Sequence, residues 1–438
     1  MGRYCFFRFV RSLFKNGTFA RLFFGRLITN AGDSAYTIAA MWLAFSLGGS
    51  SFYTGLAGFL TMLPQVFQFL AGPLVDRWPL RRILVGTQVT QGILVLVIPL
   101  AAATGWLSVW VVLVVMPLVS LLNQFVYPAQ QAALPRVVEK EELVEANSAF
   151  SFAYQGVDFV FTALGGIVVA VVGAVSLYLI DSVTFAIAAL VFVGVQIPPA
   201  ESDEGDQGED AKNVTSAVDE YRVQLADGIR YVRGSVLVWV LLGSLVVNAT
   251  IGTALAVLPA YANTHGGPDA YGFILAGITG GMLVGSLSAT PLKRFSLATL
   301  SIGGFAFSGV AWLVAIAVGW LPATVALFFL AGVPIGATNV IFAAMVQSVV
   351  PEDLMGRVSS VLASGSVGAM PVGSLLGGIG GNVFGNSIVM TSAGFGLLFI
   401  SACWLTHPLL RNLADVEDLR SERYGLTRSK RAEPSESF

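Results

Sequence analysis

Charged residues are scarce in this sequence. Asp, Glu, Lys and Arg together make up 11% of the 438 residues, whereas apolar residues make up 55%. An average soluble domain carries about 25% charged residues. A chain of this length could not cover a water-exposed surface with so few charges, so the composition excludes an ordinary soluble protein. Lipid must solvate part of the surface, and the mean hydropathy of +0.77 agrees.

Cysteine and histidine are also rare, with two of each. Cys5 and Cys403 lie far apart in the sequence, which argues against a disulfide framework or a metal site. The sequence contains no His-Glu-x-x-His string and no nucleotide-binding P-loop. A net charge of −2 provides no basic surface for nucleic acid. We therefore expect no enzyme activity, no cofactor or metal, and no nucleic-acid partner.

Long apolar segments fill most of the chain. A spanning helix needs about 20 mostly apolar residues. Hydropathy and turn signals predict twelve such spans, at 19–47, 53–74, 83–104, 107–130, 144–172, 174–196, 236–262, 270–291, 296–318, 321–348, 357–384 and 387–409. When the loops are placed alternately on the two sides, all 24 Lys and Arg fall on the side of the N-terminus or at its membrane edge. This positive-inside distribution predicts a multi-pass protein of the plasma membrane with both termini in the cytoplasm.

Residues 197–234 interrupt the spans and divide them six and six. The stretch from Glu201 to Asp210 is acidic, and the apolar residues that follow it recur at helical spacing, which indicates an amphipathic helix on the inner membrane surface. We expect a cytoplasmic tail at 1–18, a six-helix bundle at 19–196, the linker at 197–234, a second bundle at 235–409 and a cytoplasmic tail at 410–438.

The two halves resemble each other weakly. Gly72-Pro73-Leu74 has a counterpart in Gly285-Ser286-Leu287, and Gly165-Gly166 has one in Gly377-Gly378, at nearly equal offsets. Such offsets favour a duplicated six-helix unit. Transporters with two parallel halves bind their substrates at the interface of the halves, near the middle of the membrane.

The loop after the second span carries the most specific string, Gly72-Pro73-Leu74-Val75-Asp76-Arg77-Trp78-Pro79-Leu80-Arg81-Arg82. It resembles the signature of the major facilitator superfamily, roughly Gly-x-Leu-x-Asp-Arg-x-x-x-Arg-Arg. The resemblance implies an all-α membrane protein with twelve helices in two pseudo-symmetric bundles. It also implies a cytoplasmic gate formed by Gly72, Leu74, Asp76, Arg77, Arg81 and Arg82, in which Asp76 would accept hydrogen bonds or pair with an arginine. The second half keeps Gly285 and Lys293-Arg294 but lacks the acid.

Other segments look like the macrolide-efflux and enterobactin-exporter-like branch of that superfamily. They are Asn30-Ala31-Gly32-Asp33, residues 127–136, residues 141–147 and residues 351–358. This resemblance implies ion-gradient-driven export of amphiphilic small molecules, as in antiporters of multidrug resistance. Two features depart from the pattern of drug–proton antiporters. Residues 161–166 keep only the last pair of the Gly-Pro-x-x-Gly-Gly motif, and the stretch from Ser108 to Pro128 contains no arginine.

Three acids lie well inside the predicted spans, namely Asp33, Asp158 and Asp181. A charged side chain at mid-bilayer costs about 2.5–3.5 kcal/mol, so such residues usually face a cavity and serve function. We expect Asp33 and Asp158 to bind the coupling ion or the substrate, with no basic residue at their depth. The polar residues expected to line the same cavity are Asn30, Tyr36, Tyr154, Gln155, Asn123, Gln124 and Asn248. Asp181 is expected to make a helix–helix contact, and its role stays open.

Export of an amphiphilic or cationic compound is the leading hypothesis. A proton-coupled symporter importing a polar nutrient and a non-transporting sensor or scaffold are the alternatives. The expected partners are a small-molecule substrate, protons or sodium, and membrane lipid, and the chain is expected to be a monomer. The substrate, the ion and the direction of movement stay open.

Overall fold

The computed structural model describes residues 13–66, 71, 75, 78–139, 142–198, 229–233, 235–292, 296–350 and 352–411. Most of the predicted tails and acidic linker lie outside these residues. So do four predicted gate residues, Gly72, Leu74, Asp76 and Arg77. The regular structure of the described part is all α-helical, as the sequence predicts.

The helices follow one another with short connections. They are α2 (Gly17–Gly48), α3 (Ser51–Val66), α5 (Leu80–Ala103), α6 (Val109–Val137), α7 (Leu143–Val172), α8 (Ala174–Val193), α10 (Leu237–Asn263), α11 (Pro268–Leu287), α12 (Ala289–Leu292), α13 (Leu297–Val318), α14 (Leu321–Val349), α15 (Glu352–Phe384), α16 (Asn386–Thr406) and α17 (Pro408–Arg411). Within the described chain, 8 helices are long and apolar enough to cross a membrane, namely α5, α6, α8, α10, α11, α13, α14 and α16. Each coincides with a predicted span, although α6 continues past residue 130 to Val137.

Glycines with positive φ mark several connections. Gly105 (φ 76°) follows α5 and Gly319 (φ 66°) follows α13, while Gly173 (φ 83°) and Gly385 (φ 91°) precede α8 and α16. Side chains disfavour this left-handed backbone, so glycine is the natural residue at these turns. Each pair occupies corresponding connections of the two halves, which is what an internal repeat would produce.

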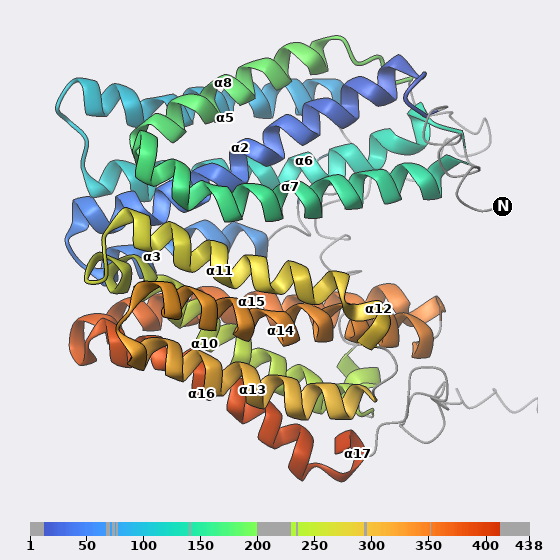
Figure 1. The fold of residues 1–438 in the computed structure, drawn as a ribbon. Helices are drawn as coiled ribbons and strands as arrows, with labels where there is room; N and C mark the ends of the chain where they lie inside the picture. The colour runs from blue at the N-terminus through green and yellow to red at the C-terminus, as the bar shows by residue number, and fades with distance from the viewer. Residues whose placement is uncertain are drawn as a thin grey trace, which may run out of the picture.

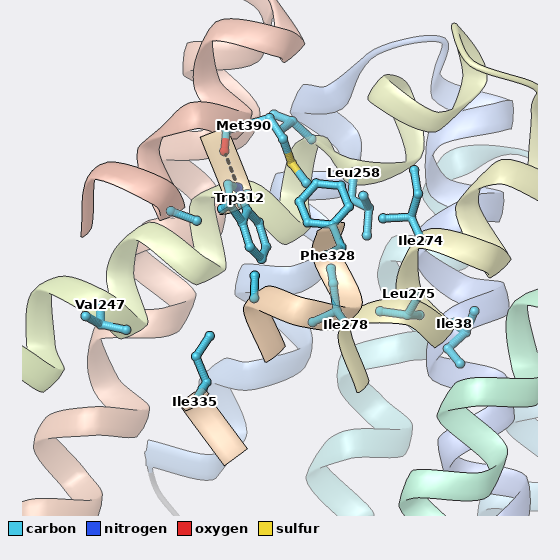
Figure 2. Close-up of a cluster of buried hydrophobic side chains, with 14 of the residues drawn as sticks. Ile38, Val247, Leu258, Ile274, Leu275, Ile278, Trp312, Phe328, Ile335 and Met390 are labelled. Atoms are coloured by element: carbon cyan, nitrogen blue, oxygen red, sulfur yellow. Dashed lines mark hydrogen bonds between the residues drawn. The ribbon is translucent and has the colours of Figure 1, made fainter. Parts of the chain in front are cut away.

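The helices gather in two groups (Figure 1). In the first group, α2 packs against α6, α7 and α8, and α5 packs against α6 and α8. In the second group, α10 packs against α15 and α16, α11 against α14, and α13 against α14 and α16. Helix α3 packs on both α6 and α15, and α7 packs on α11, so these pairs join the groups. Figure 2 shows part of the buried core, where the Trp312 indole N–H donates to the Met390 backbone oxygen at 3.0 Å beside Phe328.

Glycines bring α11 and α14 into backbone contact. A Cβ atom added at Gly281, Gly285 or Gly336 would overlap a carbonyl oxygen of the facing helix, that of Phe329, Val333 or Met282 respectively. Lipid supplies little hydrophobic drive for helix association, so close van der Waals packing at small residues is what holds such pairs together.

We expect Gly336→Ala to destabilise the protein because its methyl group would push α11 and α14 apart. Overpacking of this kind costs about 1–3 kcal/mol. The matched control is Gly303→Ala, since a Cβ there would have no neighbour within 4 Å. Thermal unfolding of the purified protein in detergent measures both variants. Equal melting temperatures for the two variants would contradict the close α11–α14 contact.

Candidate functional site

A cavity of about 350 Å³ lies between the two groups of helices. One side of its wall comes from α2, α3 and α6, and the other side comes from α10, α11 and α15. Its described lining is mixed, with polar and apolar residues in similar numbers. The lining residues are Arg26, Asn30, Asp33, Ser34, Thr37, Ile38, Met41, Gly58, Thr61, Met62, Met116, Asn123, Gly252, Leu255, Tyr271, Leu275 and Ser374.

Helix α2 supplies the longest stripe of this lining, from Arg26 to Met41. Its lining residues recur every three or four positions, which is the spacing that places side chains on one helix face. The helix is fixed at its start by Asn16, whose side-chain oxygen accepts hydrogen bonds from the backbone N–H groups of Thr18 and Phe19. Such an N-cap satisfies donors that the first turn leaves free.

Asp33 lies on this stripe. Its Oδ2 accepts a hydrogen bond from Asn123 Nδ2 of α6 at 3.3 Å. Its Oδ1 is buried and has no hydrogen-bond partner among the described residues. A buried acceptor without a partner is costly, which marks the oxygen as a place where a proton or a ligand donor would be stabilising.

Arg26 corrects one expectation, because it is a basic residue in the same cavity as Asp33. Its side chain is only 5% exposed. The guanidinium donates from Nε to Gln130 Oε1 at 3.2 Å and to the Tyr154 hydroxyl at 3.0 Å, and from Nη1 to Thr29 Oγ1 at 3.0 Å. The Arg26 carbon Cζ also lies 5.5 Å from the centre of the Tyr154 ring.

The positive charge of Arg26 acts on the Asp33 carboxylate. The loop-by-loop charge count placed Arg26 at the cytoplasmic edge of the membrane, because such a count treats basic residues as parts of the loops. The signal that it missed is the spacing of the two residues. Arg26 and Asp33 stand seven positions apart, which puts them on one face of α2, about 10 Å apart along the helix axis.

The structure brings Asn30, Asp33 and Asn123 together in the cavity wall. Asn30 Nδ2 also donates to the Tyr154 backbone oxygen at 3.3 Å. The Tyr154 hydroxyl accepts a hydrogen bond from Arg26 Nε and donates one to Gln130 Oε1. The side chains of Asp158 and Gln155 lie outside the described part of the structure, so their predicted roles stay predictions.

Three other candidates do not line this cavity. Tyr36 is 5% exposed, and its ring centre lies 6.2 Å from that of Tyr178 in α8. The side-chain amides of Gln124 and Asn248 donate to carbonyls of their own helices, those of Ser120 and Ser244, both at 2.9 Å. The sequence did not determine which face of its helix each of these three side chains occupies.

Several lining residues gave no signal in the sequence. Met41, Met62 and Met116 line the cavity, but apolar residues at helical spacing mark lipid-facing surfaces and cores as well. Tyr271 of α11 lines it too and stacks on Trp42 of α2, with ring centres 5.6 Å apart. This pair joins the two helix groups through aromatic rings, and only the assembled fold reveals it.

Two of the predicted gate residues are described. Both Arg81 and Arg82 are exposed at the start of α5. The Arg81 guanidinium donates to the Val193 carbonyl at the end of α8, and Arg21 Nη1 donates to the Gly194 carbonyl at 2.6 Å. Arg81 and Arg21 therefore satisfy free carbonyls at the C-terminus of α8, where positive charge is favourable.

The sequence matches the family model of the Major Facilitator Superfamily over residues 22–373. The chain belongs to this superfamily. It is therefore a multi-pass membrane transporter for a small molecule and not an enzyme, as the sequence predicts.

Curated relatives in the superfamily include efflux pumps. The "Multidrug efflux pump Tap" of Mycobacterium tuberculosis is 26% identical over 371 residues, which are 82% of this chain and 85% of the relative. The "Uncharacterized MFS-type transporter YkuC" of Bacillus subtilis is 24% identical over 364 residues, which are 80% of this chain and 82% of the relative.

Solved transporters share the fold. A bacterial homologue of the human lysosomal transporter Spinster, in an inward-facing and unoccupied conformation, has a TM-score of 0.67 and 13% identity over 88% of this chain and 95% of its own. An inward-facing bacterial homologue of the iron transporter ferroportin has a TM-score of 0.62 and 16% identity over 89% of this chain and 99% of its own. At such identities the likeness concerns the fold alone.

We expect a cysteine at position 123 to react from the aqueous phase, because Asn123 lines the cavity. The matched control is position 124, where the Gln124 side chain is buried and bonded to its own helix. In a background without Cys5 and Cys403, Asn123→Cys should react with a cationic methanethiosulfonate reagent at least about tenfold faster than Gln124→Cys. Mass spectrometry of the labelled protein measures both rates, and equal rates would mean that the cavity wall is assigned wrongly.

Proposed function

We propose that this chain is a secondary active transporter that exports an amphiphilic or cationic small molecule by alternating access, driven by an ion gradient. The observation that carries the proposal is the Asp33 carboxyl, which faces a cavity between the two helix groups and has one oxygen without a partner. A proton and a cationic substrate would both be stabilised there. Competition for one carboxyl is a simple way to exchange the two across a membrane.

The cavity suits a small molecule of amphiphilic character. Its volume of about 350 Å³ lies in the usual range of small-molecule sites, which is roughly 300–1,000 Å³. Three methionines contribute flexible, polarisable side chains, which can adapt to ligands of different shape. Tyr271, which stacks on Trp42, adds an aromatic ring to the same wall, and aromatic faces attract cations.

Most hydroxyl groups of the lining are already engaged. Thr37 and Thr61 donate to carbonyls of their own helices, those of Asp33 and Ala57, at 2.8 and 2.7 Å. Ser374 donates to the Gly55 carbonyl at 3.2 Å. Free hydrogen-bonding capacity is therefore concentrated at Asp33, whose Oδ1 has no partner among the described residues. A site with apolar walls and a single polar region fits an amphiphile better than a sugar, which needs many hydrogen-bonding partners.

The full proposal includes twelve spans in two six-helix bundles, at 19–196 and 235–409, with the tails at 1–18 and 410–438 and the linker at 197–234 in the cytoplasm. Helices α2, α3, α7 and α15 would be the four spans beyond the eight apolar ones. Three of them have 32, 30 and 33 residues, more than the roughly 20 that a span needs. The Gly72–Arg82 loop would be the cytoplasmic gate, and Asp158 would be a second coupling acid.

In this topology, the outer ends of α3 and α15 are closed against each other. The Ser50 hydroxyl donates to Asn382 Oδ1 at 2.8 Å, and the Ser51 hydroxyl donates to the same oxygen at 3.3 Å. One turn further in, a Cβ on Gly55 would lie 2.6 Å from the Gly378 Cα. Export by alternating access requires these helix ends to separate, so that the cavity opens to the outside.

A second candidate is proton-coupled movement of a polar solute, which Arg26, Asn30 and Asn123 in the cavity wall favour. These three side chains make part of the cavity wall polar, as the site of a polar nutrient or a zwitterion would require. Direction and substrate distinguish the two candidates. Efflux pumps among the curated relatives support export, and a preference for polar solutes over lipophilic cations would support the second candidate.

We expect Asp33→Asn to abolish gradient-driven transport, because an amide cannot exchange a proton for a cation. Inverted membrane vesicles with an imposed pH gradient, and ethidium as the lipophilic cation, measure accumulation. Loss of at least about tenfold is expected. The matched control, Asp269→Asn, removes an acid in the first turn of α11 outside the cavity lining and should accumulate the dye normally. Normal accumulation by Asp33→Asn would refute the role of this carboxyl.

We expect a disulfide between Ser51→Cys and Asn382→Cys to stop transport, because it would hold the outer ends of α3 and α15 together. Transport by the double variant should fall after mild oxidation and recover after reduction. Each single variant serves as a control and should respond to neither treatment. Transport that persists in a fully cross-linked protein would show that these ends do not part during the cycle.

A further inference from the structure

Asp181 is a second buried acid close to Asp33, on the opposite side of α2 from the cavity. Its side chain is 1% exposed and is absent from the described cavity lining. Oδ1 accepts a hydrogen bond from the Thr184 hydroxyl at 3.1 Å, while Oδ2 is buried without a partner among the described residues. The sequence placed Asp181 near the end of a peripheral helix, where a structural contact was expected.

Helices α2 and α8 pack against each other along their length (Figure 1). Gly32 of α2 faces Asp181 so closely that an added Cβ would overlap Asp181 Oδ1 and the Thr184 hydroxyl. Gly32 directly precedes Asp33, so the backbone that Asp181 touches is the backbone that carries the cavity acid. Negative charge on Asp33 acts on Asp181. Both acids keep one buried oxygen without a partner.

Few other ionisable groups face this pair. Helix α2 contributes Arg26, on the cavity side, and Tyr36. Helix α8 contributes Tyr178, whose buried hydroxyl has no partner among the described residues. Helix α5 carries only Arg81 and Arg82, both exposed in its first turn. Helix α7 contributes Glu145, Tyr154, which is bonded to Arg26, and Asp158, whose side chain lies outside the described part.

We propose that Asp181 and Asp33 form one proton-binding pair across α2, in which Asp181 is the member that the cavity does not reach. The inference rests on the proposed proton–substrate exchange and deepens it. Arg26 is the cation that lies nearest this pair among the described residues, on the cavity side with Asp33. Like charges at short range disfavour ionising both. The pair therefore shares one proton, which balances the single positive charge.

The shared proton gives Asp181 a task in exchange. When a cationic substrate binds at Asp33, the pair releases its shared proton through Asp33 into the cavity, because the substrate then supplies the second positive charge. When the substrate leaves, one proton returns to the pair. One proton is thus exchanged for one cation, and the positive charges balance the two carboxyls in both states. Among the described residues, no group of three or more His, Cys, Asp or Glu could hold a metal ion here, whereas a proton needs no further ligands.

The test is the pH profile of Asp181→Asn. Ethidium binding to the purified protein, followed by fluorescence, should weaken as protons compete for Asp33 at low pH. The neutral amide removes the charge that opposes ionisation of Asp33. We therefore expect the midpoint of this competition to move to lower pH by about one unit or more, the scale of interacting acids. The matched control is Ser182→Ala, which removes the neighbouring hydroxyl that donates to the Gly92 carbonyl at 3.1 Å, and its midpoint should not move.

An unchanged midpoint in a folded Asp181→Asn protein would overturn the pair, because a permanently protonated, structural acid predicts that result. A second measurement needs no ligand. Infrared difference spectra of the wild-type protein and of Asp33→Asn after a pH jump report protonated carboxyls directly. Asp33→Asn should retain a buried carboxyl band that responds to pH and that is lost when Asp181→Asn is added, and a band that never responds, or that persists in the double variant, would equally overturn the proposal.

Dye binding without any pH dependence in the wild type, together with a responsive carboxyl band in Asp33→Asn, would reject proton exchange at the cavity while leaving Asp181 as a proton site. A normal wild-type profile with no shift in Asp181→Asn would reject only the pair. The proposed function and the further inference can therefore fail separately.

Discussion

An ionised side chain in the middle of a bilayer costs about 2.5–3.5 kcal/mol on insertion scales, and α2 carries an arginine and an aspartate on one face. The arrangement of the first helix group answers this cost. Arg26 is surrounded by acceptors from α6 and α7 and by the ring of Tyr154, while Asp33 receives one hydrogen bond from α6. The difference is instructive. The cation is nearly satisfied by protein, and the acid is left with an unused oxygen, which is where we propose that proton–substrate exchange occurs.

Small residues make this arrangement possible. Polar groups inside a membrane can only be paired if the helices approach closely, and glycine permits that approach. Gly32 lets α8 bring Asp181 against α2, and Gly55 and Gly378 let α3 meet α15. The first contact lies inside one helix group and the second lies between groups. Glycine therefore serves both a contact inside one helix group and the contact between groups that would open in the proposed cycle.

The sequence predicted the apolar helices well because lipid imposes a length and a composition that are local properties. The turns at Gly319 and the break before Ser51 follow from the same local signals. The site was predicted only in part. Asp33 and Asn123 were recognised because polar residues in apolar spans are conspicuous. Tyr36 was expected in the cavity because it lies three positions after Asp33. A separation of three residues still leaves about 60° of rotation around a helix, which is enough to turn the Tyr36 side chain from the cavity towards α8.

Arg26 shows why electrostatics needs the fold. From the sequence alone, a basic residue near the end of a long helix can be assigned to the adjoining loop or to the interior of the membrane. Only the packing of the helices decides between the two. Once Arg26 is inside, the meaning of the acids changes. A lone ionised acid would give the cavity a net negative charge that binds cations permanently. With Arg26 in the same cavity, the net charge is zero when the acid is ionised, and it changes by one when a proton binds. Helix α2 carries that site on one face and contacts α8 with the other. In the proposed exchange, a change of charge at Asp33 would act first on α2, which packs on α8 and also on α3. Coupling between the ion and the outer α3–α15 contact would then pass through the position of α2.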